Sequence, residues 1–137
     1  MQIVRCLFLG IAALLIGCAS VQLRPGDVTV VMARDLDPKS APSGIADSFS
    51  LDGKLVAYMS FKWADIDKVG GRQVFEARWY SAERLIAKRE HTAVFVKQPY
   101  HVWFSVTAVD FAPGPAHFEL IYKGAVLARK DFEILSK

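Results

Sequence analysis

The stretch KLVAYMSFKW, residues 54–63, decides the fold class of this chain. Every second residue in it is apolar, and most of the residues between are polar; the apolar set is Leu55, Ala57, Met59, Phe61 and Trp63. Successive side chains of an extended strand point to opposite faces, so this alternation places the whole apolar set on one face. The stretch therefore predicts a β-strand that is buried on one side.

Similar stretches occur along the rest of the chain. Strands are expected at residues 28–33, 75–80, 85–90, 92–96, 102–106, 118–122 and 126–134. Loops or turns are expected between them at residues 37–44, 64–72, 81–84, 98–99, 113–115 and 123–124, most of which contain Gly, Pro, Ser or Asp. Residues 81–90 fit either a hairpin or a helical turn, and we favour the hairpin.

Seven or eight short strands without a long helical pattern predict an all-β domain, an antiparallel β-sandwich. The expected topology is immunoglobulin-like. The chain has 137 residues, which leaves room for one domain.

Part of this pattern resembles small bacterial envelope domains of unknown function, in which a Trp-containing strand, a turn and a closing hairpin ending in Phe recur. The resemblance covers about the last sixty residues, and one departure is Pro115-Ala116-His117-Phe118, where such domains often place an aromatic residue directly after the glycine. It carries over no functional residue. The matching positions are FEARWY at 75–80, Leu85-Ile86, VWFS at 102–105, and residues 114–118 with Gly124, Leu127 and Phe132.

The first twenty residues predict export. Residues 1–5 carry one positive side chain, and residues 7–16 are an apolar run of about ten residues, whereas a helix that spans a bilayer needs about twenty. Leu15-Ile16-Gly17-Cys18 resembles the bacterial lipobox, which has an apolar residue at −3 and a small residue at −1. The resemblance implies that residues 1–17 are a cleaved signal peptide and that Cys18 is lipidated with acyl chains such as palmitate. The alternative is an uncleaved signal anchor with an incidental cysteine.

The residues after Cys18 bear on the location of the protein. Ala19 and Ser20 are not the Asp-type signal for inner-membrane retention, so the resemblance to Gram-negative lipoproteins implies an outer-membrane anchor that faces the periplasm. Residues 18–27 are then the lipidated cysteine and a short tether, and residues 28–137 the β-sandwich domain. Extended fully, the nine residues from Ala19 to Asp27 would reach at most roughly 30 Å.

Composition excludes several function classes. The chain carries 17 Lys and Arg residues against 14 Asp and Glu residues, a formal net charge of +3, with no polybasic run. Neither a nucleic-acid partner nor charge-driven binding to anionic lipid is therefore expected. The two cysteines are Cys6, in the signal peptide, and Cys18, which lipidation would consume. The mature domain would have no free thiol for catalysis.

No catalytic or metal-binding motif is present. The three histidines, His91, His101 and His117, form no HxH or HxxxH pair, so a metal site is not expected. The DxD pairs at Asp35 and Asp37 and at Asp65 and Asp67 lack the other ligands of a calcium loop, and Asp is common in turns. No serine lies in a GxSxG motif. We expect a protein that is not an enzyme and has no cofactor.

Four ring side chains form the candidate binding face: Tyr58, Tyr80, His101 and Trp103, which all lie at outward parity. If their strands are neighbours, the rings form a patch suited to a protein partner or to sugar stacking. The alternative is that they pack beneath residues 33–50. We expect a non-enzymatic interaction or accessory module of the cell envelope, bound to the membrane through its lipid and to an envelope protein, or else a glycan- or peptidoglycan-binding domain. A flat aromatic patch would favour a protein partner, and a groove walled by aromatic and Asn, Gln or Asp residues would favour a sugar.

Overall fold

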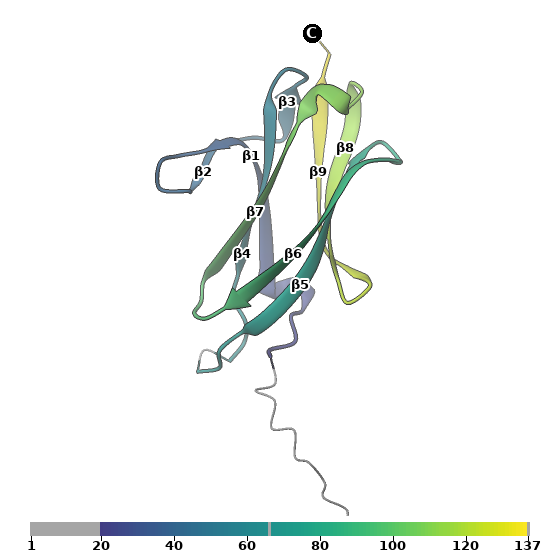
Figure 1. The fold of residues 1–137 in the computed structure, drawn as a ribbon. Helices are drawn as coiled ribbons and strands as arrows, with labels where there is room; N and C mark the ends of the chain where they lie inside the picture. The colour runs from purple at the N-terminus through teal and green to yellow at the C-terminus, as the bar shows by residue number, and fades with distance from the viewer. Residues whose placement is uncertain (1–19, 66, 137) are drawn as a thin grey trace, which may run out of the picture.

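The computed structural model describes residues 20–65 and 67–136, and it is an all-β structure. Its strands are β1 (Val28–Leu36), β2 (Pro42–Ile45), β3 (Ser48–Ser50), β4 (Lys54–Phe61), β5 (Gly71–Ser81), β6 (Arg84–Phe95), β7 (Tyr100–Thr107), β8 (Gly114–Tyr122) and β9 (Ala125–Leu135). They form a four-stranded sheet in the order β2-β1-β4-β7 and a five-stranded sheet in the order β3-β9-β8-β5-β6 (Figure 1). Strands β3 and β9 pair in parallel, and the other pairs are antiparallel. The predicted β-sandwich is confirmed, while the expected signal peptide and Cys18 lie outside the described residues.

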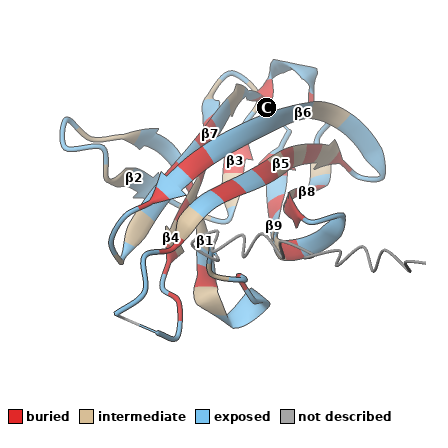
Figure 2. Ribbon diagram, turned by 60° about the horizontal axis from the view of Figure 1, so that its bottom comes forward, coloured by how far each residue is buried: buried red, intermediate tan, exposed pale blue. Residues whose placement is uncertain are grey.

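Apolar side chains from both sheets form one core. In Figure 2 the buried residues appear as red segments along the strands of both sheets. The five alternating apolar residues from Leu55 to Trp63 are all buried. Trp79 on β5 meets Phe118 on β8 edge-on, with ring centroids 4.9 Å apart, and both side chains are buried. Aromatic pairs in this geometry contribute beyond the apolar area that they bury. The period-two pattern therefore identified the inner faces of these strands correctly.

Two predicted hairpins are present. Strands β5 and β6 are joined through Ala82 and Glu83, and β8 and β9 through Lys123 and Gly124. Lys123 and Gly124 have φ angles of 50° and 79°, the positive values that the commonest two-residue hairpin turn requires at both positions. Glycine adopts this conformation without strain, so the Lys-Gly pair favours the turn locally.

Several strands differ from those expected. β6 is one continuous strand where two were expected, at residues 85–90 and 92–96. It is an edge strand with only Ala93 and Phe95 buried, so no alternation marks most of its length. β2 lies largely within the segment expected to be a loop, and β3 is a three-residue strand on β9.

The N-terminal segment, residues 21–27, belongs to the domain, whereas the sequence predicts that it is part of a short tether before the domain. The Val21 amide donates to the Gly70 carbonyl at 3.1 Å, and the Gln73 side-chain amide donates to the Val21 carbonyl at 2.7 Å. Leu23 is only 3% exposed and is part of the core. The tether prediction is therefore wrong for residues 21–27, because a buried leucine and a buried polar network hold them on the sandwich.

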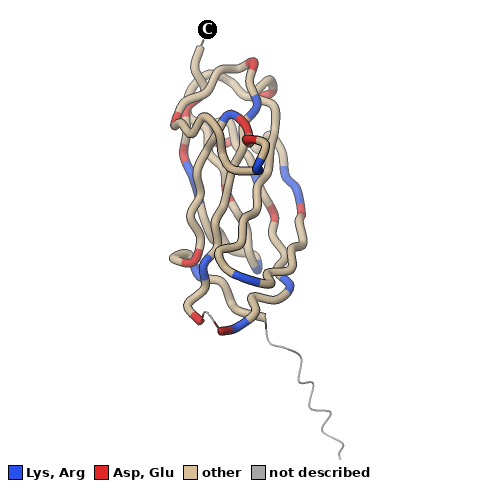
Figure 3. Tube along the Cα trace, turned by 90° about the vertical axis from the view of Figure 1, so that its left-hand side faces the viewer, with Lys and Arg blue, Asp and Glu red and all other residues tan. Residues whose placement is uncertain are grey.

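Charged residues divide unevenly between the two ends of the sandwich (Figure 3). We define the basic end as the described residues within 20–27, 62–72, 94–99 and 122–126; it contains six Lys and Arg residues and three Asp residues. The acidic end, residues 46–54, 81–84, 107–116 and 130–136, contains six Asp and Glu residues and three Lys and Arg residues. The near-balanced net charge thus conceals a charge difference along the long axis. No helix among the described residues is long and apolar enough to cross a membrane.

Candidate binding face

Strands β4 and β7 bring three of the four predicted rings together. Tyr58 on β4 is paired with Trp103 on β7, and Ser60 is paired with His101. The Tyr58 and Trp103 ring centroids are 6.0 Å apart with planes at 7°, and the Tyr58 and His101 centroids are 5.4 Å apart with planes at 28°. We call these three residues the aromatic triad, and Tyr58 is the neighbour that the other two share.

The triad lies on the outer face of the four-stranded sheet. Trp103 is 41% exposed and His101 is exposed, while Val102 and Phe104 between and beside them are buried in the core. This follows from the alternation along β7, which sends odd-numbered residues outward and even-numbered residues inward. Because β7 is an edge strand, Trp103 and His101 have no further strand beyond them in the sheet.

The alternative, that the rings pack beneath residues 33–50, does not hold for Trp103 and His101, which are exposed. Val56 shares the outward parity of Tyr58 but is only 1% exposed, whereas Trp103 remains open. Tyr58 is half-buried. Burial, and then the Asp37 carboxylate in the turn between β1 and β2, raise the pKa of Tyr58 above its ordinary value of 10.0. Both effects favour the protonated phenol over the phenolate.

A shallow hollow of about 310 Å³ adjoins the triad at the β6–β7 side of the sandwich. His91 contributes from β6, and its ring meets Phe104 edge-on with centroids 5.7 Å apart. The other lining residues come from β7 and include two triad members: Tyr100, His101, Val102 and Trp103. None of the lining residues is Asn, Gln or Asp.

Tyr80 does not join the triad. It lies on β5 in the five-stranded sheet, where it stacks on His117 of β8 with ring centroids 4.5 Å apart and planes at 12°. His117 is buried, and its Nε2 lies 3.5 Å from a Glu119 carboxylate oxygen. Parity places a side chain on the outer face of its own sheet but does not say which sheet that is. The predicted four-residue face therefore consists of three residues on one sheet and one on the other.

The acidic residues of the DxD pairs serve local structure. The Asp37 carboxylate accepts hydrogen bonds from the backbone amides of Lys39 and Ala41 at 2.8 and 3.0 Å. The Asp65 carboxylate accepts one from the Asp67 amide at 3.1 Å. Within residues 20–65 and 67–136, no group of three or more His, Cys, Asp or Glu side chains is placed to hold a metal ion.

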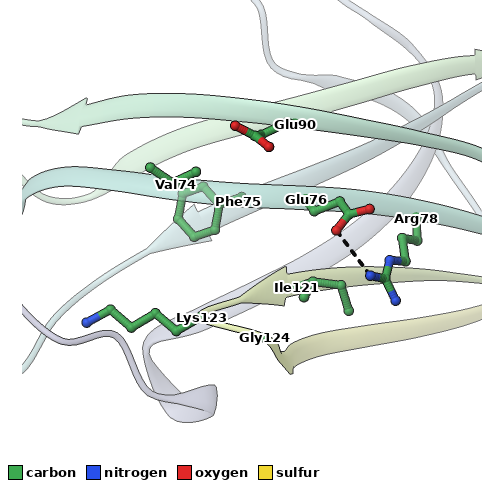
Figure 4. A pocket seen from close by; sticks show the side chains of 8 residues that line it. All are labelled: Val74, Phe75, Glu76, Arg78, Glu90, Ile121, Lys123 and Gly124. Carbon is green, nitrogen blue, oxygen red and sulfur yellow. Dashed lines mark hydrogen bonds and ion pairs between the residues drawn. The ribbon is translucent and has the colours of Figure 1, made fainter.

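A second hollow, of about 240 Å³, lies on the outer face of the five-stranded sheet near the β8–β9 turn (Figure 4). Its acidic residues are Glu76 and Glu90, which are paired across β5 and β6. Arg78 lies 3.1 Å from Glu76, and this hydrogen bond lowers the pKa of the Glu76 carboxyl and raises that of the Arg78 guanidinium. Glu76 is therefore held ionised and is poorly suited to donate a proton.

The buried polar network around Gln73 was missed from the sequence. Gln73 donates to the carbonyls of Val21 and Gly70, and its side-chain oxygen accepts from the Tyr122 hydroxyl at 2.7 Å. The sequence signal was Gly70-Gly71, which indicates a loop between strands but not what the loop contacts. A Cβ added to Gly71 would lie 2.6 Å from the Ser20 Cβ, so the chain approaches the domain closely there.

No family model matches the sequence, and no curated protein matches it. Among solved structures, an immunoglobulin-like protein from Pseudomonas aeruginosa is similar with a TM-score of 0.53 at 11% identity, over 85% of this chain and 98% of that one. A β-glucosidase from Listeria innocua, in complex with glucose, gives 0.50 at 12% identity over 80% of this chain and only 16% of that one. At such low identity the likeness concerns the fold alone. The domain is a β-sandwich of immunoglobulin-like fold.

Proposed function

We propose that this protein is a lipoprotein, anchored in the outer membrane through Cys18 and facing the periplasm, whose β-sandwich binds an envelope protein without catalysing a reaction. The observation that carries the binding proposal is the aromatic triad, which is three adjoining rings on an open face beside an edge strand. Aromatic side chains supply contact area at low conformational-entropy cost and are enriched among the residues that dominate binding energy.

A protein partner is favoured over a glycan by the surroundings of the triad. A sugar site needs hydrogen-bonding side chains around its aromatic platform, because sugar hydroxyls that lose water must find new partners. The hydrogen-bonding side chains that line the hollow beside Trp103 are His91, Tyr100 and His101, and the Asn, Gln or Asp walls expected of a sugar groove are not among the lining residues. A broad and shallow aromatic surface suits a protein better.

The test is Trp103→Ser, compared with Leu85→Ser. Leu85 lies on β6 in the other sheet and is 45% exposed, close to the 41% of Trp103, so it controls for the loss of an exposed apolar side chain. Crosslinking in intact envelopes is expected to capture a partner with wild type and with Leu85→Ser. Loss of an interface anchor worth about 2 kcal/mol or more would weaken binding about 30-fold or more, so Trp103→Ser should lose the partner.

Stability must be measured in parallel. Surface substitutions usually change the free energy of unfolding by about 0.5 kcal/mol or less, so both variants should melt close to wild type. Equal capture by wild type and Trp103→Ser would contradict the proposal. Co-sedimentation with purified peptidoglycan sacculi tests the glycan alternative. If the wild-type protein sediments with sacculi, Trp103→Ser does not, and no protein is crosslinked, then the ligand is a glycan and the proposed protein partner is wrong.

A further inference from the structure

The basic end carries exposed valines as well as cations. Val94 and Val96 flank Phe95 at the end of β6. The backbone of Gly70 lies close to Phe95, since a Cβ added to Gly70 would be 2.5 Å from the Phe95 Cβ. Val69, which precedes Gly70, therefore lies at the same end of the sandwich as the other two valines. Val69, Val94 and Val96 are 60%, 56% and 63% exposed. Exposed apolar side chains surrounded by cations are suited to bind a surface whose outer layer is anionic and whose interior is apolar, such as a membrane with anionic lipids.

The cations around these valines are open to solvent. All six Lys and Arg residues of the basic end are exposed: Arg24, Lys62, Lys68, Arg72, Lys97 and Lys123. Two of the three acids there are engaged locally, since Asp27 accepts from the Arg24 amide at 2.9 Å and Asp65 lies 3.7 Å from Lys68. The basic end therefore has a net charge of +3, and the acidic end has a net charge of −3.

The basic end is also where the chain enters the domain. Ser20 lies against Gly71, and the Val21 backbone is bound to Gly70 and Gln73. Only Ala19 and Ser20 separate Val21 from Cys18, a span of at most about 11 Å when extended. If Cys18 carries the lipid, this end cannot move far from the bilayer surface.

We propose that the basic end docks on the membrane itself, with its cations against anionic phospholipid headgroups and its exposed valines at the headgroup boundary. This inference rests on the proposed lipidation of Cys18 and adds an orientation to it. The charge difference between the ends points the same way, because a negative surface attracts the basic end and repels the acidic end. Docking holds the acidic end away from the lipid and leaves the triad, on the side of the sandwich, free to meet a partner.

The test uses the lipidated full-length protein reconstituted into vesicles. Because Cys6 and Cys18 are the only cysteines, Val96→Cys at the basic end and Glu83→Cys at the acidic end each provide a single site for a fluorescent label in the mature chain. With vesicles of equal parts phosphatidylcholine and phosphatidylglycerol, a lipid-borne quencher should quench the label at 96 and not the label at 83. Quenching at 96 should fall in vesicles of phosphatidylcholine alone and at high salt, which screens surface charge.

A charge variant and its matched control complete the test. Arg72→Gln with Lys97→Gln removes two cations of the basic end, and Lys88→Gln with Arg89→Gln removes two exposed cations from the middle of β6. At about fivefold per cation, the first pair should lower the docked-to-undocked ratio about 25-fold, and the second should leave it nearly unchanged. Lipidated protein whose labels at 96 and 83 are quenched equally overturns the docking inference and leaves the anchor intact. Protein that carries no acyl chain overturns the anchor and, with it, the docking inference.

Discussion

Trp79 is a large buried side chain of the core. It is 2% exposed, and its ring contacts both Phe118 and Phe132, at centroid distances of 4.9 and 6.2 Å. Trp79→Ala removes the largest fully buried side chain of the described residues and leaves a cavity, which is expected to cost about 3–5 kcal/mol. Because whole domains are stable by only about 5–15 kcal/mol, denaturant unfolding should show a severely destabilised protein. Phe118→Ala should behave alike, and a Trp79→Ala melt within a few degrees of wild type would contradict the packing described.

Asp35 gives a pH-dependent contribution at the residue scale. The Lys54 ammonium, 2.6 Å away, and the Leu36 amide lower the pKa of the Asp35 carboxyl below its ordinary value of 3.8. A carboxyl with a lowered folded-state pKa stabilises the fold at pH values above its unfolded pKa, and this contribution is lost as pH falls through the folded value. Asp35→Asn should therefore melt slightly below wild type at neutral pH, and the difference should vanish in acid. Both side chains are well exposed, so added salt should also shrink it.

The N-terminal segment allows a prediction at the scale of one element. Gly71 has a φ of 76°, and a Cβ there would collide with Ser20, so Gly71→Ala combines backbone strain with displacement of the segment. Gly124→Ala is the matched control, because Gly124 has a φ of 79° and nothing within 4 Å of an added Cβ. Both should lose about 1–2 kcal/mol through strain. Only Gly71→Ala should speed hydrogen exchange at Val21 and cleavage by thermolysin at the bond between Gln22 and Leu23. Equal protection in both variants would show that the segment is not held there.

Elements with one buried face were predictable, and elements at edges were not. The strand from Lys54 to Phe61 lies in the middle of its sheet and shows a clear alternation, since only one of its faces meets the core. β2 and most of β6 are edge strands held mainly by backbone hydrogen bonds, which any side chain permits, so neither shows an apolar period.

The same limit applies to the binding face. Outward parity selected Tyr58, His101, Trp103 and Tyr80 alike, but only pairing between strands distant in sequence could separate Tyr80 from the triad.

The molecule as a whole separates a folded domain from its expected anchor, and this separation can be tested at Cys18. Both sheets and the network that holds residues 21–27 lie within residues 20–65 and 67–136. Cys18→Ser should therefore leave the melting temperature of the purified protein close to wild type, in contrast to Trp79→Ala. In cells, the same substitution should abolish incorporation of labelled palmitate and leave the unprocessed precursor, because the thiol that accepts lipid is missing. Wild type should carry the label and stay with the membrane at high salt, since several acyl chains hold a protein far more firmly than one. Wild-type protein that takes up no label and runs at the size of the precursor would refute the anchor while leaving the immunoglobulin-like fold and the aromatic triad as they stand.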